Sequence, residues 1–288
     1  MTTRLAGVTI TNPSKVFWPD EGVTKLDLAQ YYARIASQIL PWLKGRPVTM
    51  ERCPDGIRKQ CFYQKQAPAN LPDGVPTMTI PAPTARRDID YIIGGRRTTL
   101  LTLVNYGCIA MHVMNGRTDH LDRPDWLAFD LDPVDGFASA ARAALLLRER
   151  LEDHGLEAFA KTSGGRGLHV LVPLRRGSAQ DQVRAYAMAI ARELAAKHPK
   201  IVTTEARKAR RRAPVYLDVM RNGSGQTLVP PFSVRWRPRA PVSMPLSWDE
   251  VSPRLNPSVF NIRTAEQRMA RKSPWARFFG HRQTLPRI

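Results

Sequence analysis

Cysteine is scarce in this chain: among 288 residues only Cys53, Cys61 and Cys108 occur. An odd and scattered set of three does not form the pattern of a disulfide framework. Cys53 and Cys61 could join a histidine around zinc, but the sequence has no CxxC pair of the kind that zinc sites commonly use. We therefore expect reduced thiols buried in the core.

Long apolar runs are also missing. No stretch approaches the roughly 18–20 apolar residues that cross a membrane, and the first seven residues, MTTRLAG, lack the apolar core of a signal peptide. The 43% of hydrophobic residues is enough for a core, so the chain is not a disordered tail. We expect a cytoplasmic protein with no membrane partner, built as one large domain or two joined lobes.

Acidic residues are few relative to basic ones. The chain has 25 Asp and Glu against 44 Lys and Arg, a formal net charge of +19. An Arg-rich genome could produce this excess, but the basic residues also gather in runs, which favours a polyanionic partner. These runs are Arg207, Lys208, Arg210, Arg211 and Arg212, followed by Arg235, Arg237 and Arg239. They lack the apolar face of a membrane-binding helix, so nucleic acid is the expected partner.

The order of apolar and turn-forming residues predicts a mixed α+β chain. Thr24 is a candidate helix cap with Asp27 three residues later, and this helix is expected to end at Pro41. Further helices are expected at 98–110, 137–154 and 179–197, strands at 46–52, 88–93, 126–132, 157–162, 168–173 and 214–219, and a Pro- and Ala-rich excursion at 66–87. We expect an N-terminal lobe at 1–110, a catalytic lobe at 111–240 and a wrapping segment at 241–288.

Two aspartates share one face of the predicted strand at 126–132. Side chains alternate along a strand, so Asp130 and Asp132 point away from the large apolar residues around them. A divalent cation would relieve their repulsion. Aspartates that merely cap a loop are the alternative, and DxD also occurs in sugar-nucleotide transferases. Asp218 adds a third acid inside another apolar strand, where an unpaired charge is costly, and this favours a site for two Mg²⁺ or Mn²⁺ ions.

A glycine-rich loop joins the predicted strands on either side of it. Residues 161–170 read KTSGGRGLHV, and three glycines let the backbone approach a ligand closely. Its amides could form an anion nest. Ser163 and Arg166 could contact phosphate, and His169 lies at the mouth of the loop. An ordinary hairpin turn is the alternative, because the loop matches neither a Walker A motif nor a dinucleotide-binding motif.

Other candidate residues come before the carboxylates. Phe62 and Tyr63 with Lys65 suit base stacking and backbone neutralisation, although an edge strand packed on the core would also explain them. Lys15 and Lys25 flank a helix start, where a phosphate could bind, or they are solvated surface lysines. A lone histidine such as His112 is more often a core residue than a ligand contact.

These motifs, in this order, resemble the polymerase domain of bacterial ligase D, a member of the archaeo-eukaryotic primase superfamily. They are Asn12 to Lys15 (NPSK), Arg52 to Gly56 (RCPDG), Phe62 to Lys65 (FYQK), His112, Asp130 to Pro133 (DLDP), Ser163 to His169 (SGGRGLH), Asp218, and Ser233 to Arg235 (SVR). The resemblance covers roughly residues 5–270.

The resemblance implies a catalytic lobe with a mixed sheet related to RNA-recognition modules, and a smaller N-terminal α/β lobe. It implies gap filling and extension of DNA ends in bacterial non-homologous end joining, near the nucleoid, with two Mn²⁺ or Mg²⁺ ions and with NTP or dNTP as substrate, ribonucleotides being preferred. The expected partners are DNA ends or gaps with a 5′-phosphate, a Ku-like end-binding protein and a separate DNA ligase.

The resemblance also assigns roles by position. The implied metal ligands are Asp130, Asp132 and Asp218; the implied nucleotide contacts are Arg52, His112, Ser163, Gly164, Gly165, Arg166, His169 and Arg235; the implied 5′-phosphate pocket is Asn12, Lys15 and Lys25; and the implied template-stacking residues are Phe62 and Tyr63 with Lys65. Three positions depart from the usual pattern of the family. Glu51 stands where some relatives carry a second base, Arg166 replaces a frequent lysine, and Arg221 replaces a polar amide.

Two other functions use the same features. A metal-dependent nuclease would use the carboxylates but has no need of a loop that holds a triphosphate. A non-catalytic DNA end-bridging module would use the basic residues, but acids in the groove would oppose DNA binding. The chain has no Lys-x-Asp-Gly adenylation motif, so we do not expect it to be a ligase itself.

Overall fold

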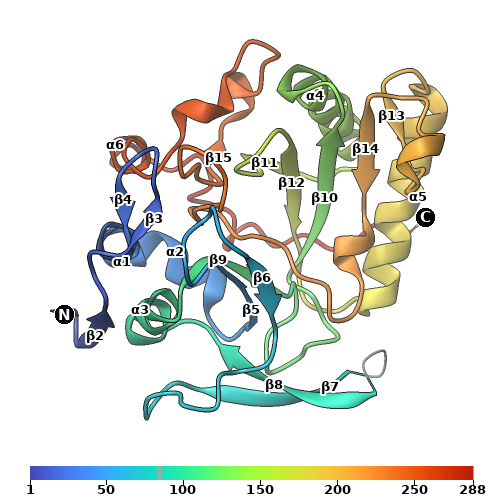
Figure 1. The fold of residues 1–288 in the computed structure, drawn as a ribbon. Coiled ribbons are helices and arrows are strands. Elements are labelled where there is room, and N and C mark those ends of the chain that lie inside the picture. Colours follow the sequence, from blue (N-terminus) through green and yellow to red (C-terminus); the bar gives the residue numbers. More distant parts are fainter. Residues whose placement is uncertain (83–85, 288) are drawn as a thin grey trace.

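A computed structural model describes residues 1–82 and 86–287, and it contains two sheets that lie side by side (Figure 1). Buried apolar residues from both sheets and from the helices around them form one continuous hydrophobic core. The fold is mixed α+β, as expected from the sequence. None of the helices in the described part of the chain is long and apolar enough to cross a membrane.

The larger sheet has six strands, all antiparallel to their neighbours except for the first pair. Its order is β13 (Val202–Thr203), β14 (Val215–Asp218), β10 (Trp126–Pro133), β12 (Leu168–Pro173), β11 (Phe159–Thr162) and β15 (Pro245–Leu246). The helices α4 (Phe137–Asp153) and α5 (Gln180–Lys197) pack on this sheet and on each other, so they cover one face of it. The polar side chains of the candidate site, described below, lie on the opposite face.

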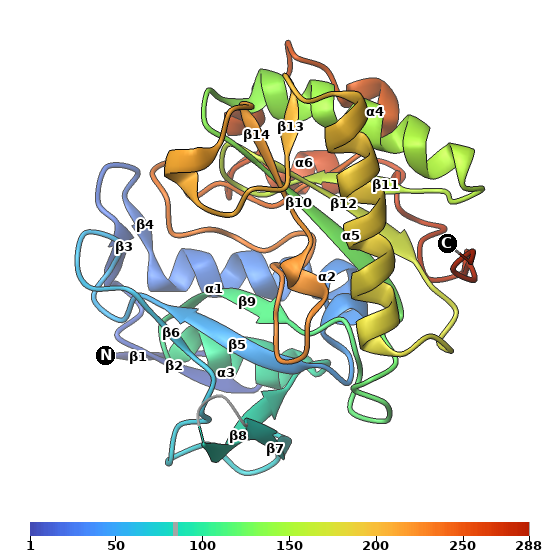
Figure 2. The ribbon, with the colours of Figure 1, turned by 90° about the vertical axis from the view of Figure 1, so that its right-hand side faces the viewer.

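The smaller sheet is built from the first part of the chain. Its order is β6 (Phe62–Gln64), β5 (Pro47–Arg52), β8 (Arg87–Ile93) and β7 (Thr77–Ala82), and β9 (Cys108–Val113) also pairs with β5. The helices α1 (Lys25–Arg34), α2 (Ala36–Leu43) and α3 (Arg97–Asn105) and two hairpins, β1 (Thr2–Leu5) with β2 (Val8–Thr11) and β3 (Val16–Trp18) with β4 (Val23–Thr24), lie beside it. Figure 2 shows α1 running between the two sheets.

Contacts from α1 join the smaller sheet to the segment around Ser233. The Tyr32 hydroxyl donates to the backbone carbonyl of Ile109 on β9 and lies 3.3 Å from Ser233 Oγ. The neighbouring Tyr31 hydroxyl donates to the carbonyl of Phe232 at 2.8 Å. Because both hydroxyls are buried and hydrogen-bonded, α1 fixes the segment around Ser233 relative to the smaller sheet.

The predicted start of the first helix is confirmed, but its predicted end is wrong. Thr24 Oγ1 accepts from the amide of Asp27, and Asp27 Oδ2 accepts from the amide of Thr24, which forms a capping box. The helix ends at Arg34, with Ile35 as its C-terminal cap, and α2 then runs through Pro41. Proline removes only one backbone donor from this short helix, and the burial of Trp42 and Leu43 beside it compensates.

Two more expected elements need correction. The helix predicted at 98–110 ends at Asn105, and β9 follows because its residues are buried on both sides of the sheet and pair with β5. The excursion predicted at 66–87 contains β7, an edge strand that pairs with β8 along its whole length. Residues 83–85 of that excursion lie outside the described residues.

The expectation that every cysteine is a reduced thiol is wrong for two of the three. Cys53 and Cys61 form a disulfide, whereas Cys108 is free and buried. The reason is the pairing of β5 with β6, in which Arg52 lies opposite Phe62. The residue after Arg52 and the residue before Phe62 are therefore neighbours, although eight positions separate them in the sequence.

The last part of the chain packs against α2 and against β11 of the larger sheet. It contains β15, the helix α6 (Ala265–Met269) and short 3-10 helices at Trp248–Glu250 and Pro257–Val259. Earlier in the chain, 3-10 helices also occur at Lys208–Arg210 and Met220–Asn222. Trp275 and Phe278 are buried against Trp42 of α2 and Phe159 of β11. This aromatic cluster attaches the C-terminal segment to the body of the protein.

Candidate functional site

Four polar side chains form one row across one face of the larger sheet. Asp218 of β14 lies directly opposite Asp130 of β10, Asp130 lies opposite His169 of β12, and His169 lies opposite Lys161 of β11. Residues opposite each other in neighbouring strands point to the same face. The fold thus brings together an acid pair, an imidazole and a lysine that are up to 88 positions apart in the sequence.

The acid pair is compensated by basic neighbours. His169 Nε2 is 3.4 Å from Asp130 Oδ1. Arg221 Nε lies 3.8 Å from Asp130 Oδ2 and 3.6 Å from Asp218 Oδ2. Burial tends to raise the pKa of Asp130, but His169 and Arg221 outweigh it and hold this pKa below its ordinary value. Burial raises the pKa of Asp218, and repulsion from Asp130 adds to the effect.

The third acid is more exposed than the other two. Asp132 has 54% of its side chain exposed, and its Oδ2 lies 3.6 Å from Arg211 Nη1. The Arg211 guanidinium stacks over the ring of Tyr216 at 4.1 Å. Arg211 Nη1 is buried and has no hydrogen-bond partner among the described residues. A buried guanidinium donor that makes no hydrogen bond and only a long ionic contact to Asp132 suits an anionic ligand.

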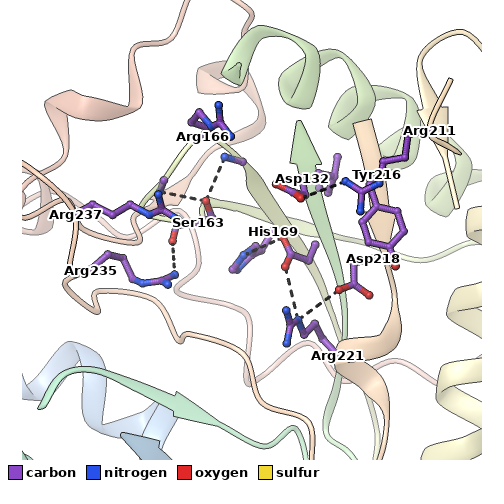
Figure 3. Close-up of a pocket in the computed structure, with 14 residues that line it drawn as sticks. Asp132, Ser163, Arg166, His169, Arg211, Tyr216, Asp218, Arg221, Arg235 and Arg237 are labelled. Carbon is purple, nitrogen blue, oxygen red and sulfur yellow. Dashed lines mark hydrogen bonds and ion pairs between the residues drawn. The ribbon is translucent and has the colours of Figure 1, made fainter. Parts of the chain in front are cut away.

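These residues surround a cavity of about 300 Å³. Figure 3 shows Arg166, Arg235 and Arg237 on one side of it and Asp218 and Arg221 on the other. Its lining consists of Asp130, Leu131, Asp132, Ser163, Gly165, Arg166, Gly167, His169, Arg211, Tyr216, Asp218, Arg221, Arg235 and Arg237. Five arginines and three aspartates in one cavity suit a ligand that combines phosphate groups with cations.

The glycine loop forms one wall of this cavity. Gly164 has a φ of +72°, a conformation that glycine adopts without strain, and a Cβ on Gly167 would lie 2.3 Å from the carbonyl oxygen of Leu131. Ser163 Oγ accepts from the amides of Gly165 and Gly167 at 3.2 and 3.3 Å. The nest predicted from the glycines is therefore partly occupied by the loop's own serine. Gly164 turns the backbone and does not line the cavity.

Lys161 is a residue that the sequence reasoning missed. Its side chain is fully buried, and its Nζ lies 2.8 Å from His169 Nδ1 and donates to Ser243 Oγ at 2.5 Å. Burial and the nearby Lys161 side chain lower the pKa of His169 to about 4, so the imidazole is neutral at pH 7. The only available signal was a lysine inside the apolar strand FAKT, where a charged residue is rare.

A second cavity, also of about 300 Å³, adjoins the first. The two share Asp130, His169, Arg221 and Arg235 as lining residues. The second cavity is further lined by Thr49, Tyr63, Lys65, His112, Gly225, Gln226, Thr227, Leu228 and Val229. The Tyr63 ring meets the His112 ring edge-on at 5.4 Å. The fold thus brings the predicted stacking and histidine positions next to the carboxylates.

Arg52 is a predicted phosphate contact that the structure does not bring to either cavity. Its Nε donates to the carbonyl of Tyr106 at 2.7 Å and its Nη1 to Gln64 Oε1 at 2.6 Å, while its guanidinium stacks over Phe62 at 5.4 Å. Neighbouring residues on a strand point to opposite faces, and it is Glu51 that faces the cavities. Phe62, which does not line them either, shares the surface occupied by Arg52.

The predicted 5′-phosphate residues do meet, at the start of α1. The amide of Lys15 donates to the carbonyl of Asn12, and the amide of Lys25 donates to the carbonyl of Lys15. Lys15 Nζ pairs with Asp55 at 2.5 Å, whereas Lys25 Nζ donates to Thr11 Oγ1 at 3.3 Å. Burial and the charge of Lys15 lower the pKa of Lys25 to about 8. Two lysines held this close favour an added anion.

The carboxylates fit a divalent cation in type and in strand placement. Carboxylate oxygens are the hard ligands that Mg²⁺ and Mn²⁺ prefer, and Asp130 and Asp218 are direct cross-strand partners. In the part of the chain that the structure describes, no three acidic, histidine or cysteine side chains converge at ligand distance. Arg221 instead provides the positive charge between the two acids, and a bound cation would take over that compensation.

Comparison with known proteins identifies the family. Residues 24–275 match the family described as LigD, primase-polymerase domain. The chain belongs to this family. The LigD primase-polymerases are nucleotidyltransferases of the DNA polymerase and primase type, which use nucleoside triphosphates and divalent metal ions.

Relatives of this LigD polymerase domain are longer proteins. The chain is 34% identical over 297 residues to the multifunctional non-homologous end joining protein LigD of Pseudomonas aeruginosa, covering 97% of this chain and 34% of that protein. Identity to the LigD protein of Mycolicibacterium smegmatis is 32% over 253 residues, covering 86% of this chain and 33% of that protein. The chain thus spans about a third of these relatives.

A solved structure of the family has the same fold over nearly its whole length. It is the polymerase domain of Mycobacterium tuberculosis ligase D in complex with DNA, which matches with a TM-score of 0.87 and 29% sequence identity. The match covers 96% of this chain and 99% of that one. The fold class expected from the sequence is therefore confirmed.

Proposed function

We propose that this chain is a metal-dependent primase-type polymerase that fills gaps and extends DNA ends in bacterial non-homologous end joining, with a preference for ribonucleotides. The observation that carries the proposal is the cross-strand row of Asp218, Asp130 and His169 beside a cavity lined by five arginines. Acids alone would suit a nuclease. Acids facing an arginine-rich cavity suit transfer of a nucleotide from a triphosphate.

Asp130, Asp132 and Asp218 would hold two Mn²⁺ or Mg²⁺ ions. When bound, such ions lower the pKa of an attacking hydroxyl and neutralise charge on the phosphates and the leaving group. The chain's own contribution is to present two carboxylates from neighbouring strands on one face of a rigid sheet. Placement on strands holds catalytic groups more accurately than placement on loops does.

The nucleotide's phosphates would lie along the glycine loop. Arg166 and Arg235 can each bind phosphate through two guanidinium donors, and both line the first cavity. His169 is neutral at pH 7. The carboxylate of Asp130 beside Nε2 can only accept a hydrogen bond, so this nitrogen carries the proton and can donate a hydrogen bond to a phosphate oxygen. The base and sugar would then reach the second cavity, near His112.

DNA would be held at two other places. Asn12, Lys15 and Lys25 would bind the 5′-phosphate at the far side of a gap, since two close lysines favour an added anion. Tyr63 is 59% exposed. It would stack on a template base, with Lys65 near the DNA backbone. The solved relative is a complex with DNA, which agrees with such a role.

The wider context of the activity is also part of this proposal. Multifunctional relatives are end-joining proteins about three times as long, so we propose that a Ku-like end-binding protein and a DNA ligase act together with this chain at chromosomal DNA ends in the nucleoid. Within the chain, we propose an N-terminal lobe at 1–110, a catalytic lobe at 111–240 and a wrapping segment at 241–288.

Extension of a labelled primer across a short gap tests the proposed function. The substrate carries a 5′-phosphate, and NTP is compared with dNTP in Mn²⁺ and in Mg²⁺. We expect templated addition that requires the metal and is faster with NTP. Shortening of the strand would indicate a nuclease, and tight binding of ends without any addition would indicate a bridging module. Equal rates with NTP and dNTP would refute the ribonucleotide preference alone.

A further inference from the structure

Glu51 is a buried carboxylate directly behind the second cavity. Only 1% of its side chain is exposed, and it lies on β5 beside residues that line the cavity. Tyr63 Oη donates to Glu51 Oε1 at 2.8 Å. Glu51 Oε2 lies 3.2 Å from His112 Nε2 and 3.4 Å from Arg235 Nε. All three partners line the second cavity. One buried carboxylate therefore contacts three residues of the cavity wall.

The three partners come from three separate parts of the chain. Tyr63 lies on β6 opposite Glu51 itself, and His112 lies on β9 opposite Thr49. Arg235 lies in the segment that α1 anchors, and its Nη1 donates to the carbonyl of Ser163 in the glycine loop at 3.2 Å. Glu51 therefore connects an aromatic residue of the smaller sheet with the phosphate-binding loop of the larger sheet.

The charge state of Glu51 decides what it can do to these partners. Burial tends to raise the pKa of Glu51, but the hydrogen bond from His112 and the charge of Arg235 outweigh it and lower this pKa to about 2. An ionised carboxylate only accepts hydrogen bonds. His112 thus keeps its proton on Nε2, and the Tyr63 hydroxyl points inward although most of the side chain is exposed to solvent.

We propose that Glu51 is a positioning residue that couples Tyr63, on the template side, to His112 and Arg235, on the nucleotide side. The nucleotide is then held tightly only when Tyr63 is seated against the carboxylate. This inference rests on the proposed polymerase function.

A merely structural role for Glu51 predicts something different. Loss of a buried hydrogen-bonded acid would lower stability and reduce the amount of active protein, which lowers the apparent kcat and leaves KM unchanged. A positioning role raises the nucleotide KM, because binding of the nucleotide is what the carboxylate supports. It also makes the effects of changing Glu51 and Tyr63 non-additive, because each substitution breaks the same contact.

The test is a double-mutant cycle with Glu51→Gln, Tyr63→Phe and the double variant, measured as nucleotide KM and kcat for templated gap filling in Mn²⁺. Asp90→Asn is the control, since Asp90 is a hydrogen-bonded carboxylate of the same sheet outside both cavities. Because hydrogen bonds to charged groups are strong, Glu51→Gln should raise KM about tenfold with kcat within about threefold of the parent. The double variant should be no worse than Glu51→Gln, and Asp90→Asn should match the parent.

Additive effects of the two substitutions, or a lower kcat with unchanged KM, would overturn the coupling. Tyr63→Phe keeps an exposed ring and should fold normally, so an unchanged KM in that variant would also overturn it even if Glu51→Gln failed to fold. If the parent chain adds no nucleotide at all, the proposed function fails first. Binding of ATP with Mn²⁺ to the parent and the three variants of the cycle, measured by calorimetry, would then still decide whether Glu51 and Tyr63 are coupled.

Discussion

Lys161 Nζ lies 2.8 Å from His169 Nδ1, and both side chains are buried beneath the carboxylates. On the other edge of the same imidazole, Nε2 faces the carboxylate of Asp130 at 3.4 Å. A carboxylate at one nitrogen and a lysine at the other select one tautomer, with the proton on Nε2. Asp130 and Lys161 together thus favour the tautomer whose Nε2 can donate toward the cavity.

Lys161→Met tests this relationship. The substitution approximately preserves side-chain length and removes the donor to Nδ1, so we expect a higher pKa for His169, because a neighbouring positive charge is lost, while Asp130 still favours the proton on Nε2. Nucleotide addition should fall about tenfold. The melting temperature should fall, because loss of the buried donor leaves His169 Nδ1 and Ser243 Oγ without their partner, so activity is compared at a temperature where both proteins are folded. Nitrogen chemical shifts of His169 between pH 5 and 8 report the tautomer and the pKa directly.

Ser243→Ala is the matched control for that experiment. It removes the other hydrogen-bond acceptor of Lys161 but leaves the contact with His169 in place. The tautomer and pKa of His169 should then match those of the parent. An imidazole that keeps its shifts unchanged in Lys161→Met would show that burial, and not the lysine, sets its state.

Asp218→Asn should separate metal binding from DNA binding. Burial and repulsion raise the pKa of Asp218, which means that its ionised form is disfavoured in the folded state at neutral pH. The amide relieves this penalty, so the variant without metal should be as stable as the parent or about 1 kcal/mol more stable. Thermal stabilisation by Mn²⁺ should be present in the parent and lost in the variant, together with nucleotide addition.

End binding is the internal check for this variant. Asp122→Asn, at an exposed carboxylate outside the cavities, should retain both the Mn²⁺ shift and the activity. DNA binding should persist in both variants, because the basic residues are unchanged. A parent-like rate of addition by Asp218→Asn would refute its assignment as a metal ligand.

The sequence predicted the parts of the site that depend on local periodicity. Alternation in the strand 126–132 placed Asp130 and Asp132 on one face, and the structure shows the apolar residues of that strand in the core. The run of glycines predicted a tight loop, which the structure confirms at Gly164 and Gly167. Both predictions need only the geometry of a strand or a turn, which a few neighbouring residues determine.

The parts that depend on strand register could not be predicted. The row that brings Asp218 opposite Asp130, and Lys161 opposite His169, is set by long-range pairing. The same limitation applies around β5. Motif order predicted Arg52 as a phosphate contact, and in the structure the pleat turns Arg52 away from the cavities and Glu51 toward them. The pairing of β5 with β6 also brings Cys53 and Cys61 together, and the expectation of reduced thiols missed this.

Trp275 should be essential for stability, and not for catalysis. Its side chain is 5% exposed, its ring stacks on Phe278 at 5.2 Å, and its Nε1 donates to the carbonyl of Ala160 at 2.9 Å. Trp275→Ala should lower the free energy of unfolding by about 3–5 kcal/mol, because a large buried ring leaves a cavity. Urea denaturation measures this change. Lys272→Ala, at an exposed position of the same segment, should have almost no effect, and equal stability of the two variants would contradict packing of this segment on the body.

We expect the proposed recognition of a 5′-phosphate by Lys25 to depend on pH. Burial and the charge of Lys15 lower the pKa of Lys25 to about 8, so its ammonium is charged below that pH and neutral above it. Preference for gaps with a 5′-phosphate should therefore be strong at pH 7 and should decline as the pH rises through about 8, although a bound phosphate shifts the transition upward. Binding of matched gaps with and without the phosphate, from pH 6.5 to 9.5, measures the preference. Lys25→Gln should show a weak preference at every pH, and Lys59→Gln, at an exposed lysine 34 positions further along the chain, should behave as the parent. A preference in the parent that is constant across this range would show that Lys25 does not contact the phosphate.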